Sequence, residues 1–167
     1  MKITIEPYNP KWRTEFKKEQ TLLLDSIEES GIRIEHIGST SVEGLAAKPV
    51  IDIMIGINDF KTAGQHIKTI ENLGYRYIPD YEDVMPCRRF FIKESNGNRT
   101  HHIHMVALDS DFWKRHLKFR DHLRVDEEDR NKYQEFKIKL AKKNWNNRDD
   151  YTDAKSEIIK KILKKVE

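Results

Sequence analysis

The sequence predicts an α+β protein in which a mixed β-sheet is flanked by helices and followed by a helical C-terminal third. The run Val50–Ile57 is apolar on both faces, as a strand inside a sheet is. Arg88–Ile92 and Thr100–Ala107 are spaced as a hairpin across the turn Ser95–Asn98. From Asp109 onward, the apolar residues recur at helical spacing. These three observations define the fold class.

The N-terminal elements follow from local signals. Lys2–Glu6 alternates polar and apolar residues, which predicts a short edge strand. Pro10–Glu29 has apolar residues at helical spacing and ends before Gly31, which predicts a helix. Arg33–Ile37 is the next predicted strand, and a Gly-Ser turn with a short helix is expected to connect it to Val50–Ile57.

The later elements are predicted in the same way. A helix is expected over Phe60–Leu73, capped by Asn58-Asp59 and closed by Gly74, before a strand at Tyr75–Ile78. Three helices are expected after the hairpin, with a polar joint at Asn144–Asp150; they are Asp111–Arg124, Glu127–Lys143 and Thr152–Val166.

Composition limits the classes of protein that the chain can belong to. At 167 residues we expect one domain, with the sheet in about residues 1–108 and the helical part in about 109–167. The net charge of +3 is too small to indicate nucleic acid as a partner. No apolar run approaches a membrane span, and the N-terminus has no signal-peptide pattern. Cys87 is the only cysteine, so we expect a cytoplasmic protein without intrachain disulfides. The oligomeric state stays open.

The turn Gly38-Ser39 is the first candidate for chemistry. A Gly-Ser step before a helix leaves backbone N–H groups and a hydroxyl free, which suits a phosphate. Thr40 belongs to the same turn, and Lys48 follows as a point charge for a phosphate oxygen. The alternatives are that Ser39 or Thr40 is an ordinary N-cap and that Lys48 is a solvated loop lysine.

Asp52 is the second candidate, because a carboxylate inside an apolar strand costs free energy unless it has a partner. We interpret it as a metal ligand and catalytic residue; the alternative is an ion pair with Arg88 or Arg89. An acid on the strand after the turn can hold a divalent metal ion against a bound phosphate.

The third candidate is the histidine cluster in Arg99–His104. Strand alternation places His102 and His104 on one face, where two imidazoles can share a metal ion or a phosphate. His104 is also a candidate catalytic residue, and the alternative is a pair of hydrogen-bonding structural histidines. Arg88 and Arg89, on the partner strand, are candidates for phosphate binding. Lys155 reads as a surface residue by periodicity alone.

The sequence resembles the GrpB family, also called the UPF0157 group, a predicted branch of the nucleotidyltransferase superfamily. The resemblance covers nearly the whole chain. Its matching segments are Glu35–Val42, Gly44–Pro49, Ile51–Ile53, Arg99–His104, Phe119–Arg124 and Tyr151–Lys155, together with Trp12 and Phe16. Glu43 stands where members often have proline.

The resemblance implies a nucleotidyltransferase-like sheet and the transfer of a nucleoside monophosphate from a nucleoside triphosphate to an acceptor. Gly38 and Ser39 would hold the triphosphate, and Asp52 would bind Mg²⁺ or Mn²⁺. Active members of the superfamily have an acid-x-acid pair on this strand, whereas here Met54 occupies the second position. His102 and His104 would complete the site and favour a transition metal.

Two other functions stay open. The first is a catalytically inactive module that binds a nucleotide or phosphometabolite on the same fold. The second, with less support, is a metal-dependent phosphoesterase.

Overall fold

A five-stranded mixed sheet is the centre of the computed structural model, which describes residues 1–167. Its strands, in spatial order, are β1 (Arg33–Ile37), β2 (Ile51–Ile57), β5 (Asn98–Ala107), β4 (Arg88–Ser95) and β3 (Arg76–Ile78). Only β2 and β5 run parallel; the other neighbouring pairs are antiparallel. The parallel register places Asp52 beside His102 and Met54 beside His104.

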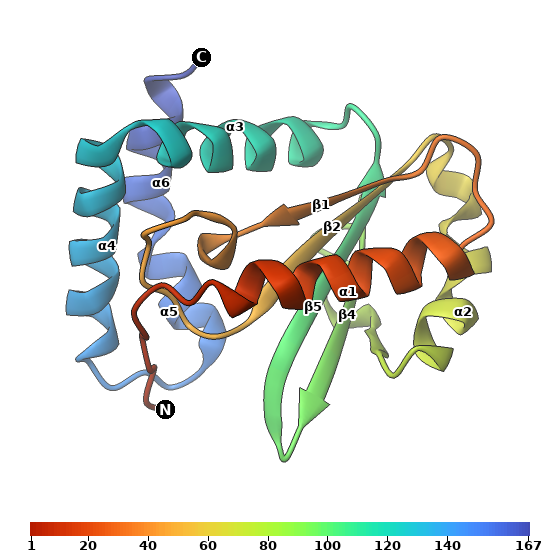
Figure 1. The fold of residues 1–167 in the computed structure, drawn as a ribbon, viewed down its shortest axis with the longest axis horizontal. Helices are drawn as coiled ribbons and strands as arrows, with labels where there is room; N and C mark the ends of the chain where they lie inside the picture. Colours follow the sequence, from red (N-terminus) through yellow and green to blue (C-terminus); the bar gives the residue numbers. More distant parts are fainter.

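Helices precede, interrupt and follow the sheet (Figure 1). The α-helices are α1 (Lys11–Ser26), α2 (Ile67–Asn72), α3 (Asp111–Val125), α4 (Glu127–Ala141), α5 (Arg148–Ala154) and α6 (Ser156–Lys164). Short 3₁₀ segments lie at η1 (Ser39–Ser41), η2 (Phe60–His66) and η3 (Pro79–Tyr81). None of the helices is long and apolar enough to cross a membrane.

The main hydrophobic core lies between one face of the sheet and the helices α1 and α2. Trp12 and Phe16 of α1 pack with Ile53, Ile55 and other buried residues of this face. Burying each such side chain stabilises the fold by about 1.5–3 kcal/mol relative to exposure. This core fixes the odd-numbered residues of β2 on the α1 side, so the even-numbered ones, including Asp52, face the other way.

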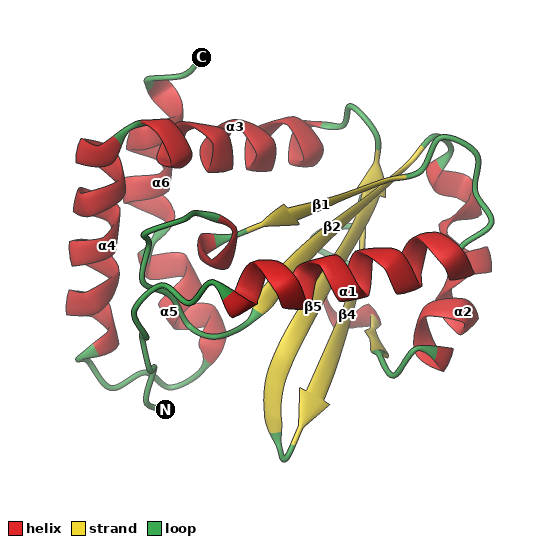
Figure 2. Ribbon diagram, viewed as in Figure 1, coloured by secondary structure: helices red, strands yellow, loops and turns green.

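The opposite face of the sheet is only partly covered by α3. Phe112 and Trp113 of α3 pack against Met54, Ile37 and Val106. Helices α4, α5 and α6 form a separate group beside the end of the sheet, with α3 leading into it (Figure 2). Residues of β2, β5, α4 and α5 line a cavity between the sheet and the C-terminal helices.

Several predicted elements differ from those observed. Lys2–Glu6 forms only an isolated bridge, Glu6 to Ala47, instead of an edge strand. The connection from β1 to β2 contains one 3₁₀ turn rather than a helix, because antiparallel neighbours need no helical crossover. The predicted helix Phe60–Leu73 is η2 followed by α2, and the last helix is divided into α5 and α6 at Lys155. The strands and the hairpin are confirmed, apart from shifts of a few residues at their ends.

Candidate functional site

Gly38 brings the turn after β1 against Asp52 of β2. Its backbone has φ +73° and ψ −178°, a combination that essentially only glycine adopts. A Cβ atom on this residue would lie 2.6 Å from Asp52 Oδ2. The turn therefore passes directly beside the carboxylate, and Ser39 and Thr40 follow immediately after this contact in the chain.

Asp52 is hydrogen-bonded by two histidines of β5. Its Oδ1 atom lies 3.1 Å from His102 Nδ1 and 3.4 Å from His104 Nε2. Burial raises the pKa of Asp52, but the hydrogen bonds and charges of the two imidazoles outweigh it and hold the pKa well below its usual value. The alternative, an ion pair of Asp52 with Arg88 or Arg89, is not formed. Ligand atoms of the three residues lie within 4.8 Å of one another, which is close enough to hold one metal ion.

Arg88 determines which ring nitrogen of His104 carries the proton. A nitrogen of the Arg88 guanidinium lies 3.2 Å from His104 Nδ1, and because a guanidinium only donates, Nδ1 must accept. The neutral ring therefore has its proton on Nε2, which donates to Asp52. Burial lowers the pKa of His104 and favours this neutral form. For Nε2 to bind a metal, the proton must move to Nδ1 and Arg88 must leave.

These residues line a cavity of about 430 Å³ between the sheet and the C-terminal helices. Two acids face it, Asp52 and Asp149. Its cationic side chains are Lys48, Arg88, Arg99, Arg115, Lys137, Arg148 and Lys155. This excess of positive charge would suit an anionic ligand with several charges.

Three of these cationic side chains form a group beside Ser39, which we call the lysine cluster: Lys48, Lys137 and Lys155. Lys137 is buried and donates to Ser39 Oγ at 2.8 Å and to the Ala46 carbonyl at 2.7 Å. Burial and the charges of Lys155 and Lys48 lower the pKa of Lys137 to about 7. Burial and the charge of Lys48 lower the pKa of Lys155 to about 8. Such crowding is unfavourable in the absence of an anion, so the cluster suits a polyphosphate.

Most of the predicted site residues meet in this cavity. They are Gly38, Ser39, Thr40, Lys48, Asp52, Arg88, His102 and His104. Arg89 does not join them, because adjacent residues of a strand face opposite sides. Its guanidinium lies over the Phe60 ring at 4.9 Å and 3.4 Å from Glu82.

The sequence interpretation missed the contribution of the C-terminal helices. No sequence signal identifies Lys137, and periodicity predicts Lys155 to be at the surface, whereas the structure shows it half-buried and lining the cavity. Tyr151 lies beneath both Lys48 and Lys155, with its ring 5.1 and 4.7 Å from their ammonium groups. The motif Tyr151–Lys155 was the available signal, since it matched the family and periodicity gave it no structural role.

Met54 occupies the place of the second acid. It lies two residues after Asp52 on the same face of β2, but it is fully buried against Phe112 and Trp113. The side chain is therefore in the hydrophobic core and not in the cavity. Asp52 is the only carboxylate that β2 directs into the site.

The mixed sheet and the helices that flank it form a nucleotidyltransferase-like fold. The structure matches that of the Cid1 poly(U) polymerase with a TM-score of 0.51, at 9% identity, over 81% of this chain and 42% of that one. At this identity the similarity shows the fold alone.

The chain belongs to the GrpB family, whose model, described as GrpB protein, matches residues 2–165. A UPF0157 protein of Halalkalibacterium halodurans is 33% identical over 163 residues, which cover 98% of this chain and 82% of the relative. The crystal structure of the conserved protein GrpB from Enterococcus faecalis matches with a TM-score of 0.83 and 33% identity, over 97% of this chain and 98% of that one.

Proposed function

We propose that the protein binds a nucleoside triphosphate in the cavity between the sheet and the C-terminal helices, and that it transfers the nucleoside monophosphate to an acceptor with the help of a divalent metal ion. One observation supports this above all: Ser39, the lysine cluster and Asp52 line the same cavity. In this arrangement the polyphosphate contacts Ser39, Lys48, Lys137 and Lys155, and its reacting end lies toward Asp52.

Asp52, His102 and His104 would hold the metal ion. Their donor set, one carboxylate and two imidazoles, fits Mn²⁺ or another transition metal better than Mg²⁺. A bound ion would neutralise charge on the phosphate oxygens. His102 and His104 hold the pKa of Asp52 low, so its carboxylate is ionised at neutral pH and ready to bind a cation.

Arg88 would couple the binding of the nucleotide to the binding of the metal ion. While Arg88 donates to His104 Nδ1, His104 Nε2 keeps its proton and points it at Asp52. A phosphate is a stronger partner for a guanidinium than a neutral imidazole is. When the nucleotide draws Arg88 away, the proton can move to Nδ1 and Nε2 becomes free to bind metal. Nucleotide and metal are therefore expected to bind cooperatively.

A catalytically inactive binding module on the same fold is the second candidate. It is favoured by the burial of Met54, which leaves β2 with one carboxylate where the superfamily pattern has two. Such a module needs only Ser39 and the cationic side chains for affinity. The two candidates differ in whether nucleotide binding depends on a metal ion.

The test is a thermal-shift titration with the four nucleoside triphosphates, each with Mg²⁺, Mn²⁺, Zn²⁺ or EDTA, because a ligand of the native state raises its stability. Metal-dependent stabilisation that Asp52→Asn abolishes would support the enzyme. Asp149→Asn is the matched control, since Asp149 lines the same cavity but is hydrogen-bonded by Tyr81 and not by the histidines. Stabilisation that persists in EDTA would favour the binding module. No stabilisation by any triphosphate would contradict nucleotide binding and direct the search to smaller phosphate esters.

A further inference from the structure

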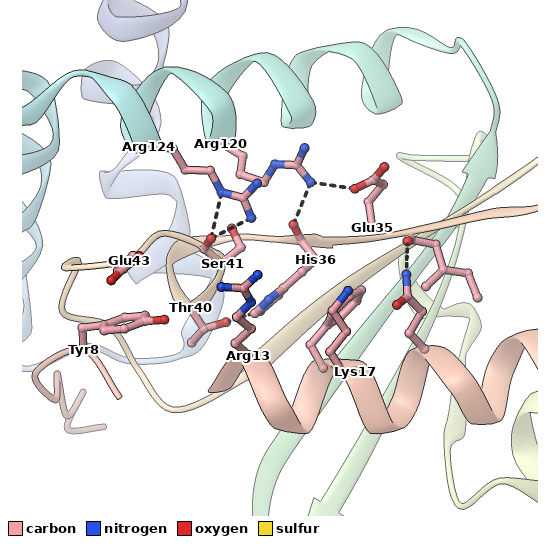
Figure 3. A pocket seen from close by; sticks show the side chains of 13 residues that line it. Tyr8, Arg13, Lys17, Glu35, His36, Thr40, Ser41, Glu43, Arg120 and Arg124 are labelled. Atoms are coloured by element: carbon pink, nitrogen blue, oxygen red, sulfur yellow. Dashed lines mark hydrogen bonds and ion pairs between the residues drawn. The ribbon is translucent and has the colours of Figure 1, made fainter. Parts of the chain in front are cut away.

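A second cavity, which we call the edge cavity, lies at the free edge of β1 and has a volume of about 440 Å³. It is bounded by α1 on one side and α3 on the other, and the turn after β1 closes its end (Figure 3). Thr40 lines both cavities, so this turn is the wall between them. The edge cavity shares neither Asp52 nor the lysine cluster with the central one.

Cationic side chains enter the edge cavity from both helices. Arg13 and Lys17 rise from α1 and have no side-chain hydrogen bond or ion pair within the protein, while Arg120 and Arg124 descend from α3 (Figure 3). Arg124 donates through Nε and one terminal nitrogen to the Ser41 carbonyl, at 3.0 and 2.9 Å, and has no carboxylate partner. These guanidinium and ammonium groups face one space from two directions.

The acids of the edge cavity do not neutralise this charge. Glu35 is already paired, at 2.8 Å with Arg120 and at 3.1 Å with Arg33. Glu43 is exposed and forms no ion pair. Arg13, Lys17 and Arg124 therefore remain available to an external anion.

His36 adds a neutral acceptor to the same space. The Thr40 hydroxyl donates its single proton to the Val50 carbonyl at 3.1 Å, so it must accept from His36 Nε2, which lies 2.9 Å away. This fixes the tautomer and leaves Nδ1 with a lone pair and no partner within the protein. Burial lowers the pKa of His36 to about 4; Asp52 opposes this effect, and the charges of Arg124 and Arg120 add to it, so the ring is neutral at pH 7. The ring is also held flat against Phe16, with centroids 4.7 Å apart.

We propose that the edge cavity binds a small organic anion that has a hydroxyl group next to a phosphate or carboxylate. The anionic group contacts Arg13, Lys17 and Arg124, and the hydroxyl donates to His36 Nδ1. The combination of unpaired cations with one fixed lone pair requires both features in the same ligand. This site is separate from the nucleotide site and does not depend on it.

Three probes distinguish the ligand's features: glycerol 3-phosphate has phosphate and hydroxyl groups, ethyl phosphate lacks the hydroxyl, and glycolate replaces phosphate by carboxylate. Binding is followed by NMR of the arginine side-chain Nε–H groups and of the imidazole nitrogens of His36. We expect saturable shifts at Arg124 Nε and His36 Nδ1 with glycerol 3-phosphate or glycolate, and the stronger of the two identifies the anionic group. Ethyl phosphate is expected to bind about tenfold more weakly than glycerol 3-phosphate.

Two double variants of α1 test the location. Arg13→Gln with Lys17→Gln removes the unpaired cations and is expected to weaken binding at least about tenfold, while the fold is retained because both side chains are exposed. Lys11→Gln with Lys18→Gln removes the same charge from the same helix outside the cavity and is expected to leave binding unchanged. Equal weakening in both pairs, or no saturable shift with any probe, would overturn the proposal. Equal affinity for ethyl phosphate and glycerol 3-phosphate would overturn the role of His36.

Discussion

Gly38 and Asp52 are so close that no side chain fits on the turn residue: a Cβ on Gly38 would lie 2.6 Å from Asp52 Oδ2. The contact joins the predicted phosphate-binding turn to the predicted metal ligand. The positive φ of Gly38 and the position of the carboxylate are thus mutually dependent, and disturbing one of them moves the other.

Gly38→Ala is therefore expected to destabilise the protein by about 1–3 kcal/mol, through backbone strain, and to displace Asp52 from its histidines. Gly97→Ala is the matched control, since Gly97 has φ +78° but nothing within 4 Å of the added Cβ. Denaturant unfolding measures the stability of each variant, and titration with Mn²⁺ measures its metal affinity. If both variants lose stability equally and both keep the same metal affinity, the contact with Asp52 has no consequence.

His104→Ala is expected to weaken Mn²⁺ or Zn²⁺ binding at least about tenfold and Mg²⁺ binding much less, because imidazole prefers transition metals. His116→Ala is the control: His116 lines the same cavity, but its Nδ1 donates to the Phe112 carbonyl at 2.8 Å. Calorimetric titration in the presence of nucleotide measures each affinity. An equal loss for all three metals, or no loss, would show that His104 is structural.

Arg88→Gln tests the coupling between nucleotide and metal. Without the guanidinium, His104 Nδ1 can take the proton, so we expect tighter Mn²⁺ binding in the absence of nucleotide and weaker nucleotide binding. The wild-type protein should bind Mn²⁺ more tightly when nucleotide is present, and the variant should lose most of this difference. Unchanged cooperativity in the variant would remove Arg88 from the link.

Lys137 is expected to make the proposed nucleotide binding depend on pH. Its pKa of about 7 means that the side chain is mostly neutral at pH 8 in the free protein, and a bound polyphosphate raises this pKa by stabilising the ammonium form. Binding at pH 8 is thus expected to take up protons, and affinity is expected to fall as the pH rises above 7. Calorimetry in buffers of different ionisation enthalpy measures the uptake.

Lys137→Met should reduce this proton uptake, and Lys155, with a pKa of about 8, accounts for a further part. Lys139→Met, on the same helix but exposed, should leave it unchanged. Proton uptake that is identical in the two variants would mean that the polyphosphate does not approach Lys137.

The sheet and half of the candidate site were predictable because their signals are local. Strand alternation is enough to place His102 and His104 on one face, and an acid between Ile51 and Ile53 identifies Asp52. The same alternation separates Arg88 from Arg89, and only Arg88 lines the cavity. The extent of the helical C-terminal third was predicted, but its position relative to the sheet was not.

The lysine cluster was not predictable from periodicity. Lys137 lies on α4 and Lys155 follows α5, and a helical pattern shows which residues share a face but not which part of the sheet that face meets. The burial of Met54 could not be predicted for the same reason, because it depends on Phe112 and Trp113 of α3 lying over β2. Long-range packing decides both features.

The free edge of β1 has a consequence for assembly. Gln20 donates to the Ile34 carbonyl at 3.0 Å, and Arg120 donates to the His36 carbonyl at 3.1 Å. An unprotected edge strand offers such carbonyls to a strand of another molecule, which leads to aggregation. Here side chains of α1 and α3 occupy these two carbonyls, which disfavours pairing of another strand with β1. The two helices that frame the edge cavity thereby also protect this edge of the sheet.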